Sequence, residues 1–320
     1  MSTALPHPHF FTAALLSAAV LCFCGCDEKQ PDIAPPPTAA PLPTELAETP
    51  DYSGDNAYVH CAALCALGPR PAGSAAYAAQ ADYLERYLTA AGWQVQRDSF
   101  AAEGVPMQNL RAVKGANITP RPLMLSCHID TKSRIPDFIG ADDGASGAAV
   151  LLELARTLPA EQAERIELVF FDGEEAFAPR MSESDGLYGS KFDAERRLRA
   201  GTLPRWQINL DMMGGRNKTI AIPALDTSDT MYTLYSAAVR DLGLSATKWT
   251  AWPGAYLDDH KPFMELGVDS LNLIAYFSGG GWWHTAKDDM SRICPRSLQE
   301  SGTVVQELCR RLLQEGKASR

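Results

Sequence analysis

Ile166–Phe177 reads IELVFFDGEEAF, and the rest of the chain can be organised around this stretch. Its first six residues are apolar except for Glu167, which is the pattern of a strand buried within a sheet. The adjacent carboxylates Glu174 and Glu175 follow where that strand would leave the sheet. Neighbouring carboxylates repel each other, so they indicate either a bound cation or a solvated turn. Other metal-competent side chains that also follow apolar runs favour the cation.

Apolar runs and amphipathic stretches alternate along the chain, which predicts an α/β fold with helices on both faces of a sheet. We expect strands over Trp93–Phe100, Asn109–Val113, Pro122–Cys127, Ile166–Phe171, Trp206–Leu210 and Ser270–Tyr276. We expect helices over Asp55–Leu67, Ala75–Ala91, Ala148–Leu158, Ser190–Arg199, Asp229–Leu242 and Ser297–Leu313. Ligands of such sheets bind at the carboxyl ends of the strands, so we expect the functional site among the residues that follow each strand.

The charge balance and the cysteines exclude some classes of protein. A formal net charge of −10 over 320 residues argues against nucleic acid as a partner, because phosphate binding needs a basic surface. Five cysteines lie beyond residue 26, and this odd number leaves at least one free thiol. None of them has the paired spacing of a zinc–thiolate site. Cys61 and Cys65 are one helical turn apart, which fits two core-facing residues better than a bridge.

The N-terminus has the features of an export signal. Residues 1–26 contain no Lys, Arg, Asp or Glu, and Phe10–Phe23 is an apolar stretch too short to span a bilayer comfortably. Cys26 follows a glycine and precedes a charged run, which resembles a bacterial lipobox with Cys26 as the lipidated residue. Simple cleavage of the leader, or a buried N-terminal helix, would be the alternatives.

These features divide the chain into three parts. We expect a lipoprotein-type signal peptide over residues 1–26, a Pro-rich linker over residues 27–50 and a folded domain over residues 51–316. The protein would then be exported to the periplasm or cell envelope and held at a membrane by a lipid anchor on Cys26.

Acidic and histidine residues recur after the predicted strands. They are His128 and Asp130 in CHID, Asp142 and Asp143 in GADDGASG, Asp211 in NLDMMG, Asp258 in DDH, and His284 in GWWHT. Each motif alone has a plainer explanation as a helix cap, a turn or a packing contact. Together at one sheet edge they predict a shared cause, and histidine and carboxylate ligands without cysteine suit Zn²⁺ in an open, catalytic site. Because residues two apart in an extended chain point the same way, Asp130 could orient the His128 imidazole.

The motifs HxD, GADDGASG, FFDGEE, NLDM and WHT, in this order, resemble the zinc aminopeptidase superfamily, which also contains the animal-type glutaminyl cyclases. The resemblance runs from about Gly68 to the last helix and implies a mixed, mostly parallel central sheet sandwiched by helices. Six segments are similar to the cyclase branch in particular: DTK (130–132), FIGA (138–141), DGEEAF (172–177), DGLYGS (185–190), DDHKPF (258–263) and WHT (283–285).

The resemblance also implies a set of zinc ligands, which are Asp143, Glu175 and His284. Asp143 is preferred to Asp142 because it stands three residues before Ser146, which is the spacing of the family's ligand. In the two-metal aminopeptidases, the residues matching His128 and Asp211 hold a second ion, whereas the cyclases work with a single zinc.

The same resemblance implies roles for four residues that are not ligands of that first ion. Glu174 would carry the proton, Asp211 and Asp258 would form a hydrogen-bonded acidic pair, and Trp283 would wall the substrate pocket. The chain departs from the animal enzymes at Ala178–Arg180, where a bulkier aromatic region is replaced, and again in a glycine run at Ser278–Gly281.

The resemblance therefore predicts a zinc-dependent glutaminyl-peptide cyclotransferase that acts on the N-terminus of a peptide or protein. It would convert N-terminal glutamine to pyroglutamate and release ammonia, and its catalytic domain would be monomeric. A zinc aminopeptidase with two ions is the alternative reading, and a non-catalytic surface receptor is a third. The retention of every metal-competent residue argues against the receptor.

Overall fold

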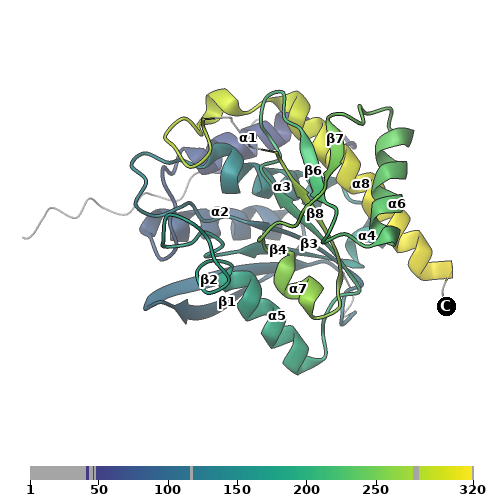
Figure 1. Ribbon diagram of the computed structural model, residues 1–320, viewed down its shortest axis with the longest axis horizontal. Coiled ribbons are helices and arrows are strands. Elements are labelled where there is room, and N and C mark those ends of the chain that lie inside the picture. The colour runs from purple at the N-terminus through teal and green to yellow at the C-terminus, as the bar shows by residue number, and fades with distance from the viewer. Residues whose placement is uncertain (1–40, 43–45, 47, 116–117, 277–280, 319–320) are drawn as a thin grey trace, which may run out of the picture. The chain divides into compact units, whose positions relative to one another are not determined.

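The computed structural model describes residues 41–42, 46, 48–115, 118–276 and 281–318 (Figure 1). The predicted signal peptide with Cys26 and most of the predicted linker lie outside these residues, as does nearly all of the glycine run at Ser278–Gly281. The strands are β1 (Gln94–Ala102), β2 (Val105–Val113), β3 (Leu123–His128), β4 (Ile166–Phe171), β5 (Trp206–Asp211), β6 (Ile220–Pro223), β7 (Trp249–Trp252) and β8 (Asp269–Ile274). The helices are α1 (Gly54–Cys65), α2 (Ala75–Ala90), α3 (Gly147–Thr157), α4 (Ala160–Ala163), α5 (Tyr188–Ala200), α6 (Asp229–Asp241), α7 (Lys261–Glu265) and α8 (Pro295–Ala318).

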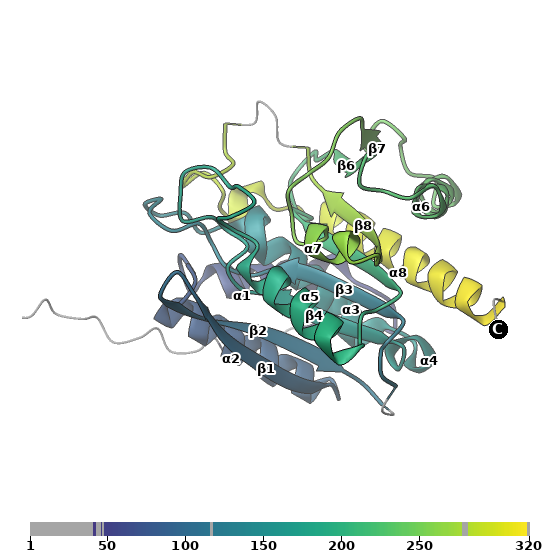
Figure 2. The same ribbon diagram turned by 60° about the horizontal axis from the view of Figure 1, so that its bottom comes forward.

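Six strands form one mixed sheet in the order β1-β2-β4-β3-β5-β8, which confirms the predicted α/β fold (Figures 1 and 2). The β1–β2 and β2–β4 pairs are antiparallel, whereas β4, β3, β5 and β8 run parallel to one another. The sequence pattern missed a second, two-stranded sheet made of β6 and β7. Each of these strands is only four residues long, which is too short for alternation to stand out.

Side chains alternate between the two faces of the central sheet because successive residues of a strand point in opposite directions. In β4, Leu168 and Phe170 belong to the larger core with α1, α2, α3 and α8, whereas Val169 and Phe171 face a smaller core that includes α7. Figure 2 shows α5 and α7 on the face opposite α2 and α3. The central strands are covered on both sides, which explains the almost continuous apolar sequences of β3 and β4.

The parallel strands place their carboxyl ends at one edge of the sheet. His128 ends β3 and pairs with Phe171 at the end of β4, and Asp211 ends β5. An irregular helical turn (η1, Ala141–Ser146) then leads into α3 at the same edge. Its Gly144 has φ +100°, and a Cβ there would lie 2.8 Å from the Asp130 carbonyl oxygen, so this close approach requires glycine.

The described chain contains no disulfide and no helix suited to crossing a membrane. Cys61, Cys65, Cys127, Cys294 and Cys309 are all free thiols, and Cys61 and Cys65 are both buried, as expected for core-facing residues. Among the described residues, no helix is both long enough and apolar enough to span a bilayer.

Candidate metal centre and active site

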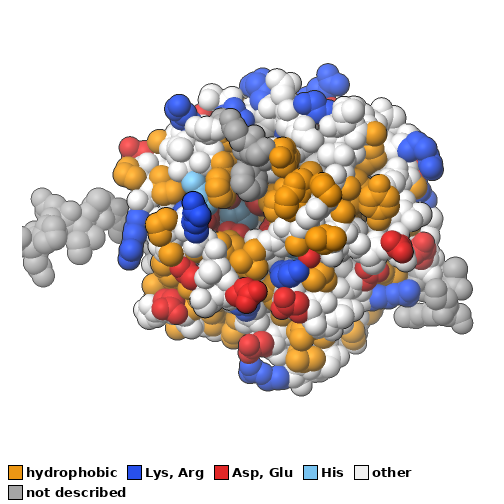
Figure 3. Space-filling view, in the orientation of Figure 1, with side chains coloured by type: hydrophobic (Ala, Val, Ile, Leu, Met, Phe, Trp, Pro, Cys, Tyr) orange, Lys and Arg blue, Asp and Glu red, His pale blue; other side chains and the backbone are white. Residues whose placement is uncertain are grey.

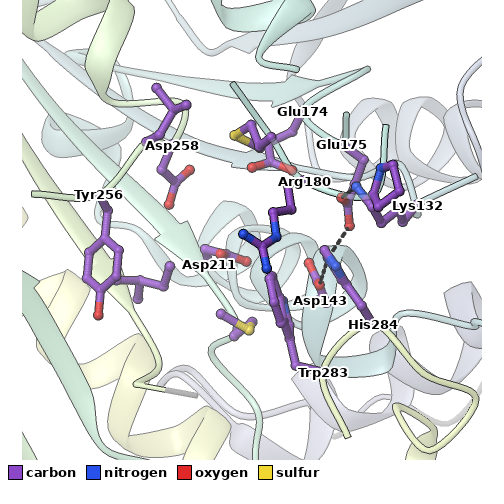
Figure 4. A pocket seen from close by; sticks show the side chains of 15 residues that line it. Lys132, Asp143, Glu174, Glu175, Arg180, Asp211, Tyr256, Asp258, Trp283 and His284 are labelled. Carbon is purple, nitrogen blue, oxygen red and sulfur yellow. Dashed lines mark hydrogen bonds and ion pairs between the residues drawn. The ribbon is translucent and has the colours of Figure 1, made fainter. Parts of the chain in front are cut away.

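The residues expected to carry the chemistry converge on one cavity of about 570 Å³ at the carboxyl edge of the sheet. On the space-filling surface it is a hollow with histidine and acidic side chains at its floor and apolar side chains along its rim (Figure 3). Seven of the predicted site residues line it: Asp143, Glu174, Glu175, Asp211, Asp258, Trp283 and His284 (Figure 4). His128 lies beneath them and is almost fully buried.

Asp143, Glu175 and His284 bring one ligand atom each to within 4.8 Å of one another, as predicted for a metal site. His284 Nε2 lies 3.1 Å from Glu175 Oε1 and 3.4 Å from Asp143 Oδ2 (Figure 4). Asp143 Oδ2 is buried and accepts no hydrogen bond in the described structure, so it has an unused lone pair that faces this point. Two carboxylates and one imidazole with room for a further ligand fit Zn²⁺ in an open site.

A second set of donors adjoins the first and shares one residue with it. His128, Asp143 and Asp211 also place a ligand atom each within 4.8 Å of one another. His128 Nε2 lies 3.1 Å from Asp143 Oδ1 and 3.2 Å from Asp211 Oδ1. Asp143 therefore turns one oxygen toward each set, which is the arrangement that a carboxylate bridging two ions requires. The structure thus offers donors for a second ion, at the residues for which the sequence predicted one.

The electrostatics of both sets favour a cation. Burial lowers the pKa of His284, but the neighbouring carboxylates of Asp143 and Glu175 outweigh this effect and raise it to about 9. Burial raises the pKa of Asp211 to about 7 in spite of the neighbouring His128. These shifts reflect carboxylates crowded into a space with little water, where positive charge is stabilised. A metal ion supplies that charge without a proton.

Glu174 lines the cavity beside both donor sets but belongs to neither. Burial raises the pKa of Glu174 well above its ordinary value, and the negative charges of Glu175 and Asp258 add to the shift, whereas His128 opposes it. A carboxyl group in this position can exchange a proton with a molecule in the cavity without losing a metal contact.

Two buried aspartates hold the loops that carry these side chains. Asp130 accepts hydrogen bonds from the backbone N–H groups of Glu174 (3.1 Å) and Glu175 (3.2 Å). Asp288 accepts corresponding bonds from the N–H groups of Asp142 (2.9 Å) and Asp143 (3.0 Å). Asp130 Oδ1 also lies 3.7 Å from His128 Nδ1, which is within ion-pair distance but beyond a hydrogen bond. That Asp130 orients the His128 imidazole stays a prediction.

The predicted hydrogen bond between Asp211 and Asp258 is also absent from the described structure. Asp258 instead accepts hydrogen bonds from the side-chain amides of Asn209 (3.0 Å) and Asn272 (2.7 Å), which project from β5 and β8. These donors, on neighbouring strands, hold both carboxylate oxygens of Asp258 in place. The two aspartates nevertheless line the same cavity, and the negative charge of Asp258 contributes to the raised pKa of Asp211.

Two further site residues, Lys132 and Asp288, had no role predicted from the sequence. Lys132 is buried and places its Nζ 3.2 Å from Glu175 Oε2 and 3.0 Å from the Ala176 carbonyl oxygen. Asp288, which binds the N–H groups of Asp142 and Asp143, is the other. Each is a charged residue four positions after a predicted site residue: Lys132 follows His128, and Asp288 follows His284. Charged residues are common on protein surfaces, so this spacing alone does not identify them. Trp283 forms part of the wall, as predicted, and stacks on His284 with 3.7 Å between ring centroids.

Comparisons with known proteins agree with this geometry. Residues 110–309 match the model of peptidase family M28. A glutaminyl-peptide cyclotransferase of Bothrops jararaca is 30% identical over 257 residues, which are 68% of this chain and 69% of that protein.

Solved structures give the same result. The glutaminyl cyclase of Porphyromonas gingivalis superposes with a TM-score of 0.72 at 30% identity, covering 83% of this chain and 99% of that one. A Zn-dependent exopeptidase of Parabacteroides distasonis gives a TM-score of 0.71 at 29% identity, covering 81% and 98%. The chain therefore belongs to peptidase family M28, and glutaminyl cyclases of animals and bacteria are among its homologues.

Proposed function

We propose that this protein is a zinc-dependent glutaminyl-peptide cyclotransferase, which converts the N-terminal glutamine of peptides to pyroglutamate with release of ammonia. The observation that carries the proposal is Glu174, a buried carboxyl group that faces the cavity beside a metal-competent set without belonging to it. The similarity to cyclases from a snake and a bacterium supports the same reaction.

In this proposal Asp143, Glu175 and His284 would hold the ion, which supplies a Lewis acid that polarises the γ-amide carbonyl of the substrate. The α-amino nitrogen of the glutamine attacks its own side-chain carbonyl carbon, so the chain needs to supply neither a nucleophile nor an activated water. The new bond joins that nitrogen to the carbonyl carbon, and the bond from the carbonyl carbon to the amide nitrogen breaks. Glu174 accepts a proton from the attacking amine and returns it to the departing nitrogen, which leaves as ammonia.

The other cavity residues would position the substrate for ring closure. The Asp258 carboxylate is fixed by two asparagine amides, so it can accept a hydrogen bond from the substrate without moving. Asp211, with a raised pKa, can hold a proton near the reacting amide. The Trp283 ring would pack against the glutamine side chain. Holding the amine and the amide in a near-attack geometry is the main task, because both groups already belong to one residue.

The second donor set favours one alternative, a two-zinc aminopeptidase. His128, Asp143 and Asp211 would then hold a second ion, and Glu174 would act on water instead of on an amine. The similarity to a Zn-dependent exopeptidase adds weight to this alternative.

Mass spectrometry of one glutamine-initiated peptide separates the two activities. A cyclotransferase removes the mass of one ammonia and leaves the peptide at full length, whereas an aminopeptidase removes a whole residue. A parallel incubation with the metal-depleted protein controls for spontaneous cyclisation. Loss of a residue, with no loss of ammonia, would overturn the cyclotransferase proposal.

We further propose that the protein is exported and anchored through a lipid on Cys26, because its leader is uncharged and apolar and is followed by a Pro-rich stretch. Replacing Cys26 with Ser should then release the protein from the membrane fraction or leave its leader uncleaved. Wild-type protein found free in the cytosol would contradict this proposal.

A further inference from the structure

Arg180 stands at the cavity and forms no ion pair with any residue of the described part of the chain. It lies in the loop between β4 and α5, lines the cavity and is exposed to solvent. Figure 4 shows its side chain reaching into the cavity toward Trp283. Arg180 forms no hydrogen bond or ion pair with any other residue that the structure describes. This is the loop in which the sequence departs from the animal cyclases.

The loop that carries Arg180 is fastened at both ends. The Asp185 carboxylate accepts hydrogen bonds from the backbone N–H groups of Phe177 (2.9 Å) and Ala178 (2.8 Å). Lys191 Nζ donates to the carbonyl oxygens of Glu183 (2.7 Å) and Gly186 (2.8 Å). These bonds hold the backbone on both sides of Arg180, from which its side chain reaches the cavity.

Among the described lysines and arginines that line the cavity, Arg180 is the one whose charged group is available to a ligand. Lys132, the other lysine or arginine in the lining, is buried and already bonded to Glu175 and to a backbone carbonyl. The remaining charged residues of the lining, His284 apart, are carboxylates, which would repel an anionic group placed deeper in the cavity. A guanidinium stays charged at all relevant pH values and offers planar, paired donors that match a carboxylate.

We propose that Arg180 recognises a carboxylate carried by the residue that follows the N-terminal glutamine. This inference rests on the proposed function, in which the glutamine occupies the floor beside Glu174 and the next residue lies toward the entrance. The carboxylate is either the side chain of Asp or Glu at the second position or, in a dipeptide, the terminal carboxylate. Arg180 is therefore a residue that sets substrate preference, and peptides beginning Gln-Glu or Gln-Asp are the favoured class.

The test compares matched peptides on the full-length protein. Gln-Glu-Ala-Ala amide, Gln-Gln-Ala-Ala amide and Gln-Lys-Ala-Ala amide differ only in the second side chain, and Gln-Ala acid against Gln-Ala amide isolates the terminal carboxylate. We expect kcat/KM for the Glu peptide to exceed that for its Gln counterpart by about three- to tenfold, the effect of a partly exposed ion pair. The ratio should fall as sodium chloride is raised, because salt screens the pair.

Two substitutions and one control complete the test. Arg180→Gln should bring the Glu-to-Gln ratio close to one, and Arg180→Glu should make the Lys peptide the better substrate. Arg199→Gln removes the same charge from an exposed site on α5, where Arg199 pairs with Glu195, and should leave the ratio unchanged. Equal turnover of the three peptides by the wild type, or a preference that persists in Arg180→Gln, would overturn this inference alone. Failure to cyclise any glutamine peptide would overturn the proposed function and the inference with it.

Discussion

Asp288 accepts a hydrogen bond of 3.0 Å from the backbone N–H of Asp143, and this bond joins the loop that carries His284 to the turn that carries Asp143. Asp288 lies four residues after His284, and its other oxygen binds the N–H of Asp142 at 2.9 Å. Asp288 thereby holds Asp143 and His284, two of the three donors of the first metal set, in a fixed relative position without having to contact the ion.

The first prediction follows from this arrangement. Asp288→Asn should lower zinc affinity by about 10- to 100-fold, because an amide nitrogen cannot accept one of the two backbone hydrogen bonds. Zinc competition against a chelator of known affinity measures the change. Asp289→Asn is the matched control, since the Asp289 side chain accepts a bond from the Ser291 N–H within its own turn and, in the described structure, none from the turn that carries Asp143. Wild-type affinity in Asp288→Asn would show that the loop is held by other contacts.

The second prediction concerns Asp143, which faces both donor sets. Asp143→Ala should remove nearly all bound zinc, whereas His284→Ala and His128→Ala should each affect only the set to which that histidine belongs. Metal analysis of the three purified variants, beside circular dichroism to show that each is folded, gives the answer. Undiminished zinc in His284→Ala would contradict the assignment of the first set. If the wild type binds one zinc and His128→Ala binds the same amount, the result would favour the single-zinc arrangement of the cyclases.

A third prediction separates proton transfer from metal binding. Glu174→Gln should lower kcat by about 10²- to 10⁴-fold, because the amide cannot carry the proton. Zinc content should stay at the wild-type level, since Glu174 belongs to neither donor set. If zinc is lost together with activity, Glu174 is a ligand and the proposed role is wrong.

The fourth prediction concerns stability in acid and lies away from the cavity. His60 is buried in α1 with its Nδ1 2.7 Å from the Tyr83 hydroxyl, and its Nε2 has no hydrogen-bond partner in the described structure. Burial lowers the pKa of His60 to about 3, and the charge of Arg156 adds to this effect. The unfolded chain takes up this proton below about pH 6.5, where folded His60 remains neutral.

The free energy of unfolding should therefore fall as the pH drops from about 6.5 toward 3, by at most about 1.4 kcal/mol per pH unit from this one group. His60→Gln removes this component, so its stability should depend less steeply on pH than that of the wild type. Denaturant unfolding at several pH values measures both slopes. Tyr83→Phe is the control, because it alters the contact but keeps the histidine and hence the slope. Parallel profiles for the wild type and His60→Gln would refute the prediction.

The sequence predicted those parts of the molecule that depend on local pattern. Strands β3 and β4 are nearly continuous apolar runs, β5 and β8 carry apolar residues between polar ones, and the parallel arrangement brings the residues after them to one edge. The metal set of Asp143, Glu175 and His284 came from a resemblance in motif order, and the structure brings these residues together.

What the sequence could not predict depends on contacts between distant segments. Alternation predicted Asp130 beside His128, where the structure has the two side chains 3.7 Å apart. It did not predict that Asp130 also binds the N–H groups of Glu174 and Glu175, which belong to a segment more than forty residues away. Likewise, the partners of Asp258 are asparagines on β5 and β8, and the pairing of those strands is not visible in their sequences. A side chain that can satisfy its hydrogen bonds in several ways is placed by the tertiary fold.

The donors of the first metal set come from three loops, and His284 lies 109 residues beyond Glu175. An unfolded chain could not keep such distant groups together, so the ion would bind only the folded protein. Its binding would then be linked to folding, and a free zinc concentration 100 times the dissociation constant would raise the free energy of unfolding by about 2.7 kcal/mol. The zinc supply of the surroundings would thus influence how long each molecule stays folded and resists proteolysis.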